Sequence, residues 1–238
     1  MFDLTVRPFT AHTIRRLTAS TTKTAARRAF DRWSGSYERD PLSRWIGKRQ
    51  REALEALGLG TEDRLLDIGC GTGAAVRAAA EVAERAVGVD LSPKMLAEAR
   101  ERAAGVKGVE FVEGDSEELP FADGEFTAVL CTTSLHHYPR PDAAAREIAR
   151  VLAPGGRAVI GDATSDALFT RGLDFLCRKF EAGHVRFHSV EEVRRLLEDA
   201  GLERAEGRSI WGGTYGMVLA RKAAERAPAA TGASSQSP

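Results

Sequence analysis

Short apolar runs alternate with amphipathic segments from about residue 64 onward. Five runs are rich in β-branched and apolar residues and predict strands: "RLLDIG" (64–69), "AVGVD" (86–90), "VEFVEGD" (109–115), "FTAVLCTTS" (126–134) and "RAVIGDA" (157–163). The alanine-rich run at 74–85 predicts a helix after the first strand. Alternation is weak at 109–115, which predicts a strand buried on both faces.

Further periodic segments predict helices at 91–105, 142–152 and 188–201, and closing strands at 203–210 and 215–222. Ser92 is a good N-cap, and Pro93 follows it at the first helical position. Ser189 and Glu192 have the spacing of a capping box. Strands that alternate with helices in this way predict an α/β fold with a Rossmann-like doubly wound sheet. The sheet is expected to be mostly parallel with an antiparallel last strand and helices on both faces.

The regions outside this alternation differ in composition. Residues 1–50 are rich in Thr, Ser and Arg, and "TIRRLTASTTKTAARRAF" contains no acidic residue. Such a segment superficially resembles an organellar transit peptide, but a basic helical lid or arm is the preferred interpretation. Residues 51–222 are expected to form the folded domain. Residues 223–238 offer little apolar surface to bury and are expected to be disordered.

Charge and cysteine content narrow the classes of function. Lys plus Arg and Asp plus Glu both number 34, so the net charge gives no reason to expect a nucleic-acid partner. The three cysteines match no zinc or disulfide spacing, which favours a cytoplasmic location. No apolar run is long enough to span a membrane, and no secretory signal is evident at the N-terminus.

The stretch "LLDIGCGTGAAV" (65–76) carries the main chemical signal. It predicts a strand that ends near Asp67, a turn with three alternating glycines, and the start of a helix. The pattern fits the dinucleotide fingerprint, with Asp90 placed to bind a ribose diol, so NAD is possible on this basis alone. Asp115 ends the third strand, however. The three carboxylates of Asp67, Asp90 and Asp115 suit a positively charged nucleoside such as S-adenosylmethionine better than a pyrophosphate.

Residues 65–163 resemble the class I S-adenosylmethionine-dependent methyltransferases. "LLDIGCGTG", "VGVDLSPKML", "VEFVEGDSEELPFADGEF" and "EIARVLAPGGRAVI" match consecutive motifs of the branch that includes ubiquinone/menaquinone-type and other small-molecule enzymes. The resemblance implies methyl transfer to an oxygen, nitrogen or carbon atom of a small molecule, such as a lipid, quinone or natural-product scaffold. One departure is Thr127, which stands where the family usually has an acid. It opens a strand away from the expected site, so little effect is expected.

The resemblance also implies a role for each matched position. Asp67 and Gly69 would lie at the methionine end, Gly71 and Gly73 would shape the loop, and Asp90 would bind the ribose. The remaining expected cofactor contacts are Leu91 and Met95 at the adenine, Asp115 and Ser116 at its amino group, the backbone near Cys131 and Thr132 at the methionine amine, and Tyr37 in an aromatic segment over the cofactor. Tyr37 could equally anchor a helix on the core.

Methyl transfer chiefly requires alignment and exclusion of water, so no metal is expected. A base is needed only for a hydroxyl or acidic carbon acceptor, and His136 and His137 are the candidates, unless the pair merely shapes its loop. His184 and His188 have the spacing of a metal pair but lack a third ligand nearby, and they could instead line an acceptor pocket. The alternatives to an S-adenosylmethionine-dependent enzyme are an NAD-dependent oxidoreductase and a non-catalytic protein that binds S-adenosylmethionine.

Overall fold

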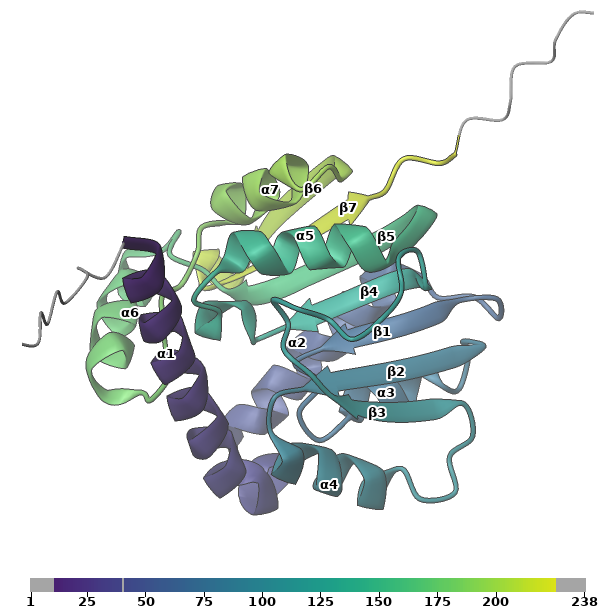
Figure 1. The fold of residues 1–238 in the computed structure, drawn as a ribbon, viewed down its shortest axis with the longest axis horizontal. Helices are drawn as coiled ribbons and strands as arrows, with labels where there is room; N and C mark the ends of the chain where they lie inside the picture. The colour runs from purple at the N-terminus through teal and green to yellow at the C-terminus, as the bar shows by residue number, and fades with distance from the viewer. Residues whose placement is uncertain (1–10, 40, 226–238) are drawn as a thin grey trace, which may run out of the picture.

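The computed structural model describes residues 11–39 and 41–225, which contain a seven-stranded sheet in the order β3-β2-β1-β4-β5-β7-β6 (Figure 1). The strands are β1 (Arg64–Ile68), β2 (Arg85–Asp90), β3 (Val109–Glu113), β4 (Phe126–Thr132), β5 (Leu152–Ala163), β6 (Glu203–Ile210) and β7 (Tyr215–Arg221). Strands β1 to β5 are parallel, whereas β7 runs antiparallel to both of its neighbours. The predicted mostly parallel sheet with an antiparallel last strand is confirmed.

Helices cover both faces of the sheet. They are α1 (Ala11–Trp33), α2 (Pro41–Leu57), α3 (Ala74–Ala79), α4 (Pro93–Arg102), α5 (Pro141–Val151), α6 (Leu168–Phe180) and α7 (Val190–Asp199), with short 3-10 helices η1 (Ser34–Arg39), η2 (Leu135–His137) and η3 (Trp211–Gly213). Successive apolar side chains of a strand point to opposite faces of the sheet, so a hydrophobic core forms on each face. Leu66 and Ile68 of β1 belong to the core that includes α5 and α7, whereas Leu65 packs with α2, α3 and α4.

The helix-start signals in the sequence are confirmed. The Ser92 hydroxyl accepts a hydrogen bond from the Met95 amide at 3.1 Å, and Pro93 opens α4. At α7, Ser189 and Glu192 form the predicted capping box in both directions. These local bonds satisfy amide groups that the first turn of a helix leaves without partners.

Two local predictions were wrong. The helix expected at 74–85 ends at Ala79, because β2 begins at Arg85 in register with Arg64 of β1 and leaves room only for turns. The strand expected to be buried on both faces is β3, which forms the edge of the sheet. Of its residues only Phe111 is buried.

Residues 11–33 and 41–57 form helices α1 and α2, so the expected boundary after residue 50 falls inside α2. Ala53 and Leu57 of this helix are buried in the core that it shares with the sheet. Most of the tail expected to be disordered, residues 226–238, lies outside the described residues. No helix in the described part of the chain is long and apolar enough to cross a membrane.

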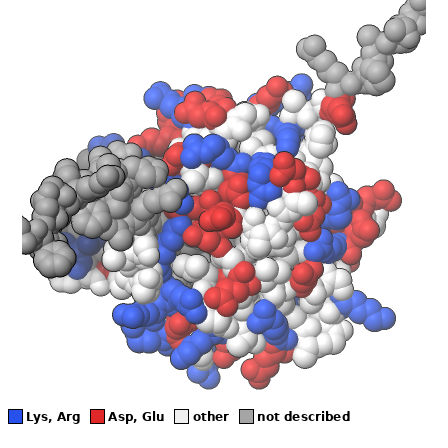
Figure 2. Space-filling view, viewed as in Figure 1, with Lys and Arg blue, Asp and Glu red and all other residues white. Residues whose placement is uncertain are grey.

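The carboxyl ends of the parallel strands form the edge of the sheet where a ligand site is expected. The parallel strands end on the side where α1 lies across the molecule (Figure 1). Ligands of doubly wound sheets bind at this edge. On the face shown in Figure 2, basic and acidic side chains are interspersed rather than gathered by sign, in keeping with a formal net charge of zero.

Candidate active site

The glycine loop connects β1 to α3, and its three glycines have positive φ angles of 73°, 53° and 73°. A Cβ on Gly69 would lie 2.7 Å from Cβ of Ser134, and one on Gly73 would lie 2.5 Å from the ring of Phe111. No atom of the described residues lies within 4 Å of the Cβ position at Gly71. Gly69 and Gly73 therefore allow close packing, while Gly71 faces open space.

Asp90 holds this loop from the end of β2. One carboxylate oxygen accepts a hydrogen bond from the Gly71 amide at 2.9 Å, and the other accepts one from the Ser92 amide at 2.8 Å. Removal from water raises the pKa of Asp90, although these backbone bonds oppose the shift. The Gly71 amide therefore points toward a carboxylate.

Asp67 lies on β1 and is completely buried. Neither carboxylate oxygen has a hydrogen-bond partner among the described residues. Burial, with a smaller contribution from the charge of Asp90, raises the pKa of Asp67 to about 8. A buried acid without a donor is unfavourable for stability, so its presence at this edge calls for a functional explanation.

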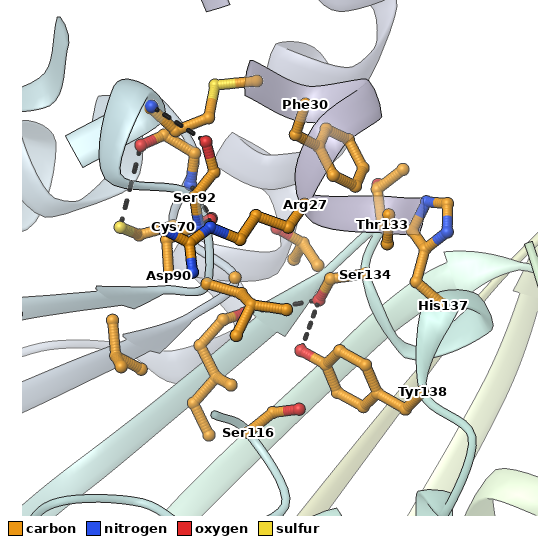
Figure 3. A pocket seen from close by; sticks show the side chains of 18 of the residues that line it. Arg27, Phe30, Cys70, Asp90, Ser92, Ser116, Thr133, Ser134, His137 and Tyr138 are labelled. Carbon is orange, nitrogen blue, oxygen red and sulfur yellow. Dashed lines mark hydrogen bonds between the residues drawn. The ribbon is translucent and has the colours of Figure 1, made fainter. Parts of the chain in front are cut away.

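A pocket opens at the carboxyl ends of the strands beneath α1 (Figure 3). The predicted residues that line it are Tyr37, Gly69, Gly71, Asp90, Leu91, Met95, Asp115, Ser116, Thr132 and His137. The predicted residues Asp67, Gly73, Cys131 and His136 do not line it. The structure thus brings most of the predicted set into one cavity.

Helix α1 contributes pocket residues that the sequence did not single out: Lys23, Arg27 and Phe30. The ammonium group of Lys23 lies 2.6 Å from Asp115 and also pairs with Glu117. The composition of this segment indicated a basic helix, but only the tertiary structure shows which of its face residues reach the pocket.

Two further contacts attach the N-terminal elements to the loops of this edge. Ser92 donates a hydrogen bond to Asp31 of α1 at 2.6 Å. Thr72, in the glycine loop, donates one to Glu38 of η1 at 2.7 Å. Both pairs lie beside the pocket, so α1 and η1 are bonded to the same loops that build it.

The end of β4 carries a group of hydroxyls. Tyr138 donates to Ser134 at 3.0 Å, and Ser134 donates to the backbone oxygen of Ile68 at 3.3 Å (Figure 3). Cys131 lies 3.2 Å from the Ser134 oxygen, and burial raises the pKa of its thiol to about 12. The thiol is therefore protonated at neutral pH. Thr133, which the sequence did not single out, has a φ of 52° and lines the pocket.

The two histidines after β4 differ in their surroundings. His136 lies 2.8 Å from Asp162 through Nδ1 and does not line the pocket. Burial opposes protonation of His136, but Asp162 raises its pKa overall. His137 lines the pocket, and its ring packs edge-on against Phe30 with centroids 5.0 Å apart (Figure 3). Burial, together with the nearby His136, lowers the pKa of His137.

The second histidine pair is not brought together as a pair. His184 hydrogen-bonds to Asp174 at 2.9 Å, and one ligand atom of His184 lies within 4.8 Å of ligand atoms on His136 and Glu181. His188 is not part of this group, and neither of its ring nitrogens has a partner among the described residues. The fold therefore places His184 beside His136 and Glu181 rather than beside His188.

S-adenosylmethionine fits the pocket that these residues form. Asp90 is placed at the end of β2, where a ribose diol would reach it, and Leu91 and Met95 provide apolar walls for a base. The unpartnered carboxylate of Asp67 suits a ligand with positive charge. A pyrophosphate would find the Gly71 amide already bonded to Asp90. This geometry favours S-adenosylmethionine over NAD.

Comparison with known proteins identifies methyltransferases. Residues 66–160 match the family model described as "Methyltransferase domain". The chain is 37% identical to 27-O-demethylrifamycin SV methyltransferase of Amycolatopsis mediterranei over 71% of its own length and 64% of that protein's. It is 28% identical to demethylmenaquinone methyltransferase of Staphylococcus aureus over 84% and 94%, respectively.

Solved structures agree on the fold. A structure from Thermotoga maritima, described as a S-adenosylmethionine-dependent methyltransferase and possible histamine N-methyltransferase, superposes with a TM-score of 0.68 at 25% identity. The match covers 82% of this chain and 99% of that one. The sheet order, the glycine loop with its acidic strand ends and the matched family model thus agree: the chain carries a methyltransferase domain of the class I S-adenosylmethionine-dependent type, and it spans less than two thirds of the length of the relatives that it matches above 30% identity.

Proposed function

We propose that the protein transfers the methyl group of S-adenosylmethionine to an oxygen, nitrogen or carbon atom of a small molecule. The observation that carries this proposal is the pairing of Asp90 with the Gly71 amide near the buried Asp67, which has no hydrogen-bond partner among the described residues. This arrangement places two acids where a dinucleotide site would need free amides. A bound cationic cofactor would favour the ionised forms of these acids and would compensate their charge.

Each pocket residue then has a proposed task. Asp90 binds the ribose hydroxyls, Leu91 and Met95 hold the adenine, and Asp115 with Ser116 meets its amino group. The methionine end lies near Gly69 and Thr132, whose side chain accepts a hydrogen bond from Gln50 at 3.3 Å. Asp67 and Gly73 support the loop from below. Tyr37, in T-shaped contact with Trp33 at 4.7 Å, closes the pocket from η1.

Helix α1 is proposed to act as the lid of the site. The Lys23–Asp115 ion pair and the Phe30–His137 contact attach it at two separate points of the pocket rim. Methyl transfer is a direct displacement, and the sulfonium supplies the activated carbon when the cofactor is bound. What the protein adds is alignment and the exclusion of water, and a closed lid provides both.

The acceptor is proposed to bind near His137 and Phe30, on the side of the pocket away from Asp90. These rings form an aromatic wall suited to a flat or apolar molecule. Where the nucleophile is a hydroxyl, His137 is the candidate to take up its proton, because His136 does not line the pocket. The cytoplasm is the proposed compartment, since all three cysteines are free thiols.

Titration calorimetry with S-adenosylhomocysteine, and with NAD in parallel, tests the proposal. The wild-type protein is expected to bind S-adenosylhomocysteine and not NAD. Asp90→Ala should weaken that binding by roughly 100-fold, because hydrogen bonds to a charged group contribute about 1.5–3 kcal/mol. Asp199→Ala, which changes an exposed acid at the end of α7, is the matched control and should bind as the wild type does.

The outcomes separate the three classes of function. Binding of NAD in place of S-adenosylhomocysteine would make the protein a dinucleotide-binding protein and overturn the proposal. Labelled S-adenosylmethionine incubated with small-molecule extracts provides the catalytic test. Transfer of label supports an enzyme. Binding without transfer to any extract would favour a non-catalytic protein that binds the cofactor.

A further inference from the structure

Three potential metal ligands converge outside the cofactor pocket. His136 belongs to η2, Glu181 follows α6, and His184 lies in the connection to α7. One ligand atom from each lies within 4.8 Å of the other two. The side chains of His136 and His184 are 8% and 0% exposed, whereas that of Glu181 is 42% exposed. Two fixed imidazoles thus meet one carboxylate that has room to move.

Each histidine of this cluster is oriented by a second carboxylate. Nδ1 of His136 lies 2.8 Å from Asp162, and Nε2 of His184 lies 2.9 Å from Asp174. These bonds leave Nε2 of His136 and Nδ1 of His184 as the nitrogens that can bind an ion. Carboxylates that hold the distal nitrogen in this way are the usual outer partners of metal-bound histidines.

Asp174 is itself well fixed. It accepts a hydrogen bond from the Phe187 amide at 2.6 Å and pairs with Arg178 at 2.6 Å. The orientation of His184 therefore does not depend on Glu181. An acid placed by two other groups can serve as a rigid support for a ligand.

The free nitrogen of His184 also points to a bound ion. Nδ1 is buried without a hydrogen-bond partner among the described residues, and the nearest Glu181 oxygen is 3.5 Å away. A buried polar atom left without a partner is costly. A metal ion between His184 and Glu181 would remove that cost and would take its third ligand, a nitrogen, from His136.

We propose that His136, Glu181 and His184 bind a divalent zinc-type ion. Two imidazoles and a carboxylate are ligands that Zn²⁺ accepts, and three protein ligands leave a fourth position for water. Bonds of about 2.0–2.1 Å in a tetrahedron place ligand atoms roughly 3.4 Å apart. The three ligand atoms, which lie within 4.8 Å of one another, must therefore draw together on binding, and the exposed Glu181 side chain has the most room to move.

The ion would tie the α6–α7 connection to the loop that carries the pocket histidine. His137 follows His136 directly, its Nδ1 contacts the Gly183 oxygen at 3.2 Å, and its Nε2 lies 3.7 Å from Glu181. Helix α6 and α1 both lie at the carboxyl ends of the strands (Figure 1). Metal binding would therefore stiffen the acceptor side of the pocket. This role does not depend on methyl transfer.

The test is zinc titration calorimetry on tag-free, EDTA-dialysed protein, with Co²⁺ absorption spectra as a second readout. The wild type is expected to bind one ion per chain with micromolar affinity or better and to show the intense visible bands of tetrahedral cobalt. Glu181→Gln and His184→Gln should each weaken binding at least tenfold. His188→Gln changes a nearby buried histidine outside the cluster and is the matched control, with binding expected at the wild-type level.

Several outcomes would overturn the site. Absence of zinc binding in the wild type would leave His184 as an ordinary partner of Asp174. Binding that survives both Glu181→Gln and His184→Gln would place the ion elsewhere. Because Glu181 is exposed, its variant should remain folded even if His184→Gln does not. S-adenosylhomocysteine binding, measured on the same samples, reports failure of the cofactor site separately from failure of the metal site.

Discussion

Two aspartates near the ends of the same strand, β1, have opposite surroundings. Asp63, just before the strand, accepts hydrogen bonds from the Gly60 amide at 2.7 Å, from Thr127 at 2.6 Å and from Arg157 at 2.7 Å and 3.0 Å. Asp67, four residues later, has no hydrogen-bond partner among the described residues. The Arg157 bonds, foremost, lower the pKa of Asp63, while burial raises that of Asp67.

The contrast separates stability from function within one strand. At the amino end, Arg157 also bonds the backbone oxygen of Leu57, and Thr127 bonds Asp63, so that α2, β1, β4 and β5 are joined through satisfied polar groups. At the carboxyl end, Asp67 has no hydrogen-bond donor in the part of the chain that the structure describes. Sites built for a ligand often carry such local instability, which the rest of the fold supports.

The largest effect is expected from Asp63→Ala. It leaves Arg157, which is 15% exposed, without its carboxylate, and breaking a buried ion pair typically costs about 3–5 kcal/mol. For a domain of this size, the melting temperature should fall by roughly 6–20 °C. Calorimetric melting and S-adenosylhomocysteine titration together check the result. If Asp63→Ala changed the affinity for S-adenosylhomocysteine by more than about threefold, the amino end of β1 would also contribute to ligand binding, contrary to this comparison.

Asp67→Asn should have the opposite effect on stability. Because burial raises the pKa of Asp67 from 3.8 to about 8, the folded state binds a proton that the unfolded state releases. Its contribution is therefore fully present below about pH 4 and is lost as the pH rises toward 8. The variant, free of this loss, should melt at least about 2–4 °C higher than the wild type at pH 8.

The same substitution should weaken S-adenosylhomocysteine binding, since the ammonium group of the ligand favours the ionised form of Asp67, which asparagine cannot adopt. Melting curves between pH 4 and pH 9 provide the measurement, and Asp63 provides the internal comparison. Its lowered pKa gives a stabilising contribution that is present above about pH 4 and is lost in acid. Equal pH slopes in the variant and the wild type would show that Asp67 does not titrate as described.

Two glycines, one near each end of β1, allow a second test of the difference between the two ends. Gly71 and Gly58 have φ angles of 53° and 57°, and neither has an atom within 4 Å of its Cβ position. Alanine at either position should cost about 1 kcal/mol of stability, because both residues have a left-handed backbone conformation. Only Gly71→Ala should also weaken S-adenosylhomocysteine binding, measured by calorimetry. Equal effects of the two variants on affinity would argue against close approach of the ligand to Gly71.

The smallest effect is expected from Lys23→Met, which removes the ion pair between α1 and Asp115. The pair is partly exposed, so the loss of S-adenosylhomocysteine affinity should be only a few-fold. Cleavage within α1 by a protease should become faster as the helix loosens. Arg28→Met, at an exposed position on the same helix, is the control. Unchanged proteolysis in Lys23→Met would mean that other contacts hold the lid.

Local signals in the sequence predicted much of the fold. Strand and helix alternation, the Ser92 cap and the Ser189 capping box depend on neighbouring residues, and all were found in the structure. The edge position of β3 and the short α3 were not predicted, because strand order and register arise from packing between distant segments. Thr127 was expected to matter little, yet it bonds Asp63 across the amino end.

What the sequence by itself determined is the family and the acidic strand ends, because the motif order and the glycine pattern lie in continuous stretches. The tertiary structure alone decided which side chains meet. It placed Lys23 on Asp115, separated His136 from the pocket that His137 lines, and joined His136 to Glu181 and His184. These contacts join residues far apart in the chain, and spacing along a sequence carries no information about such encounters until the sheet brings the loops to one edge.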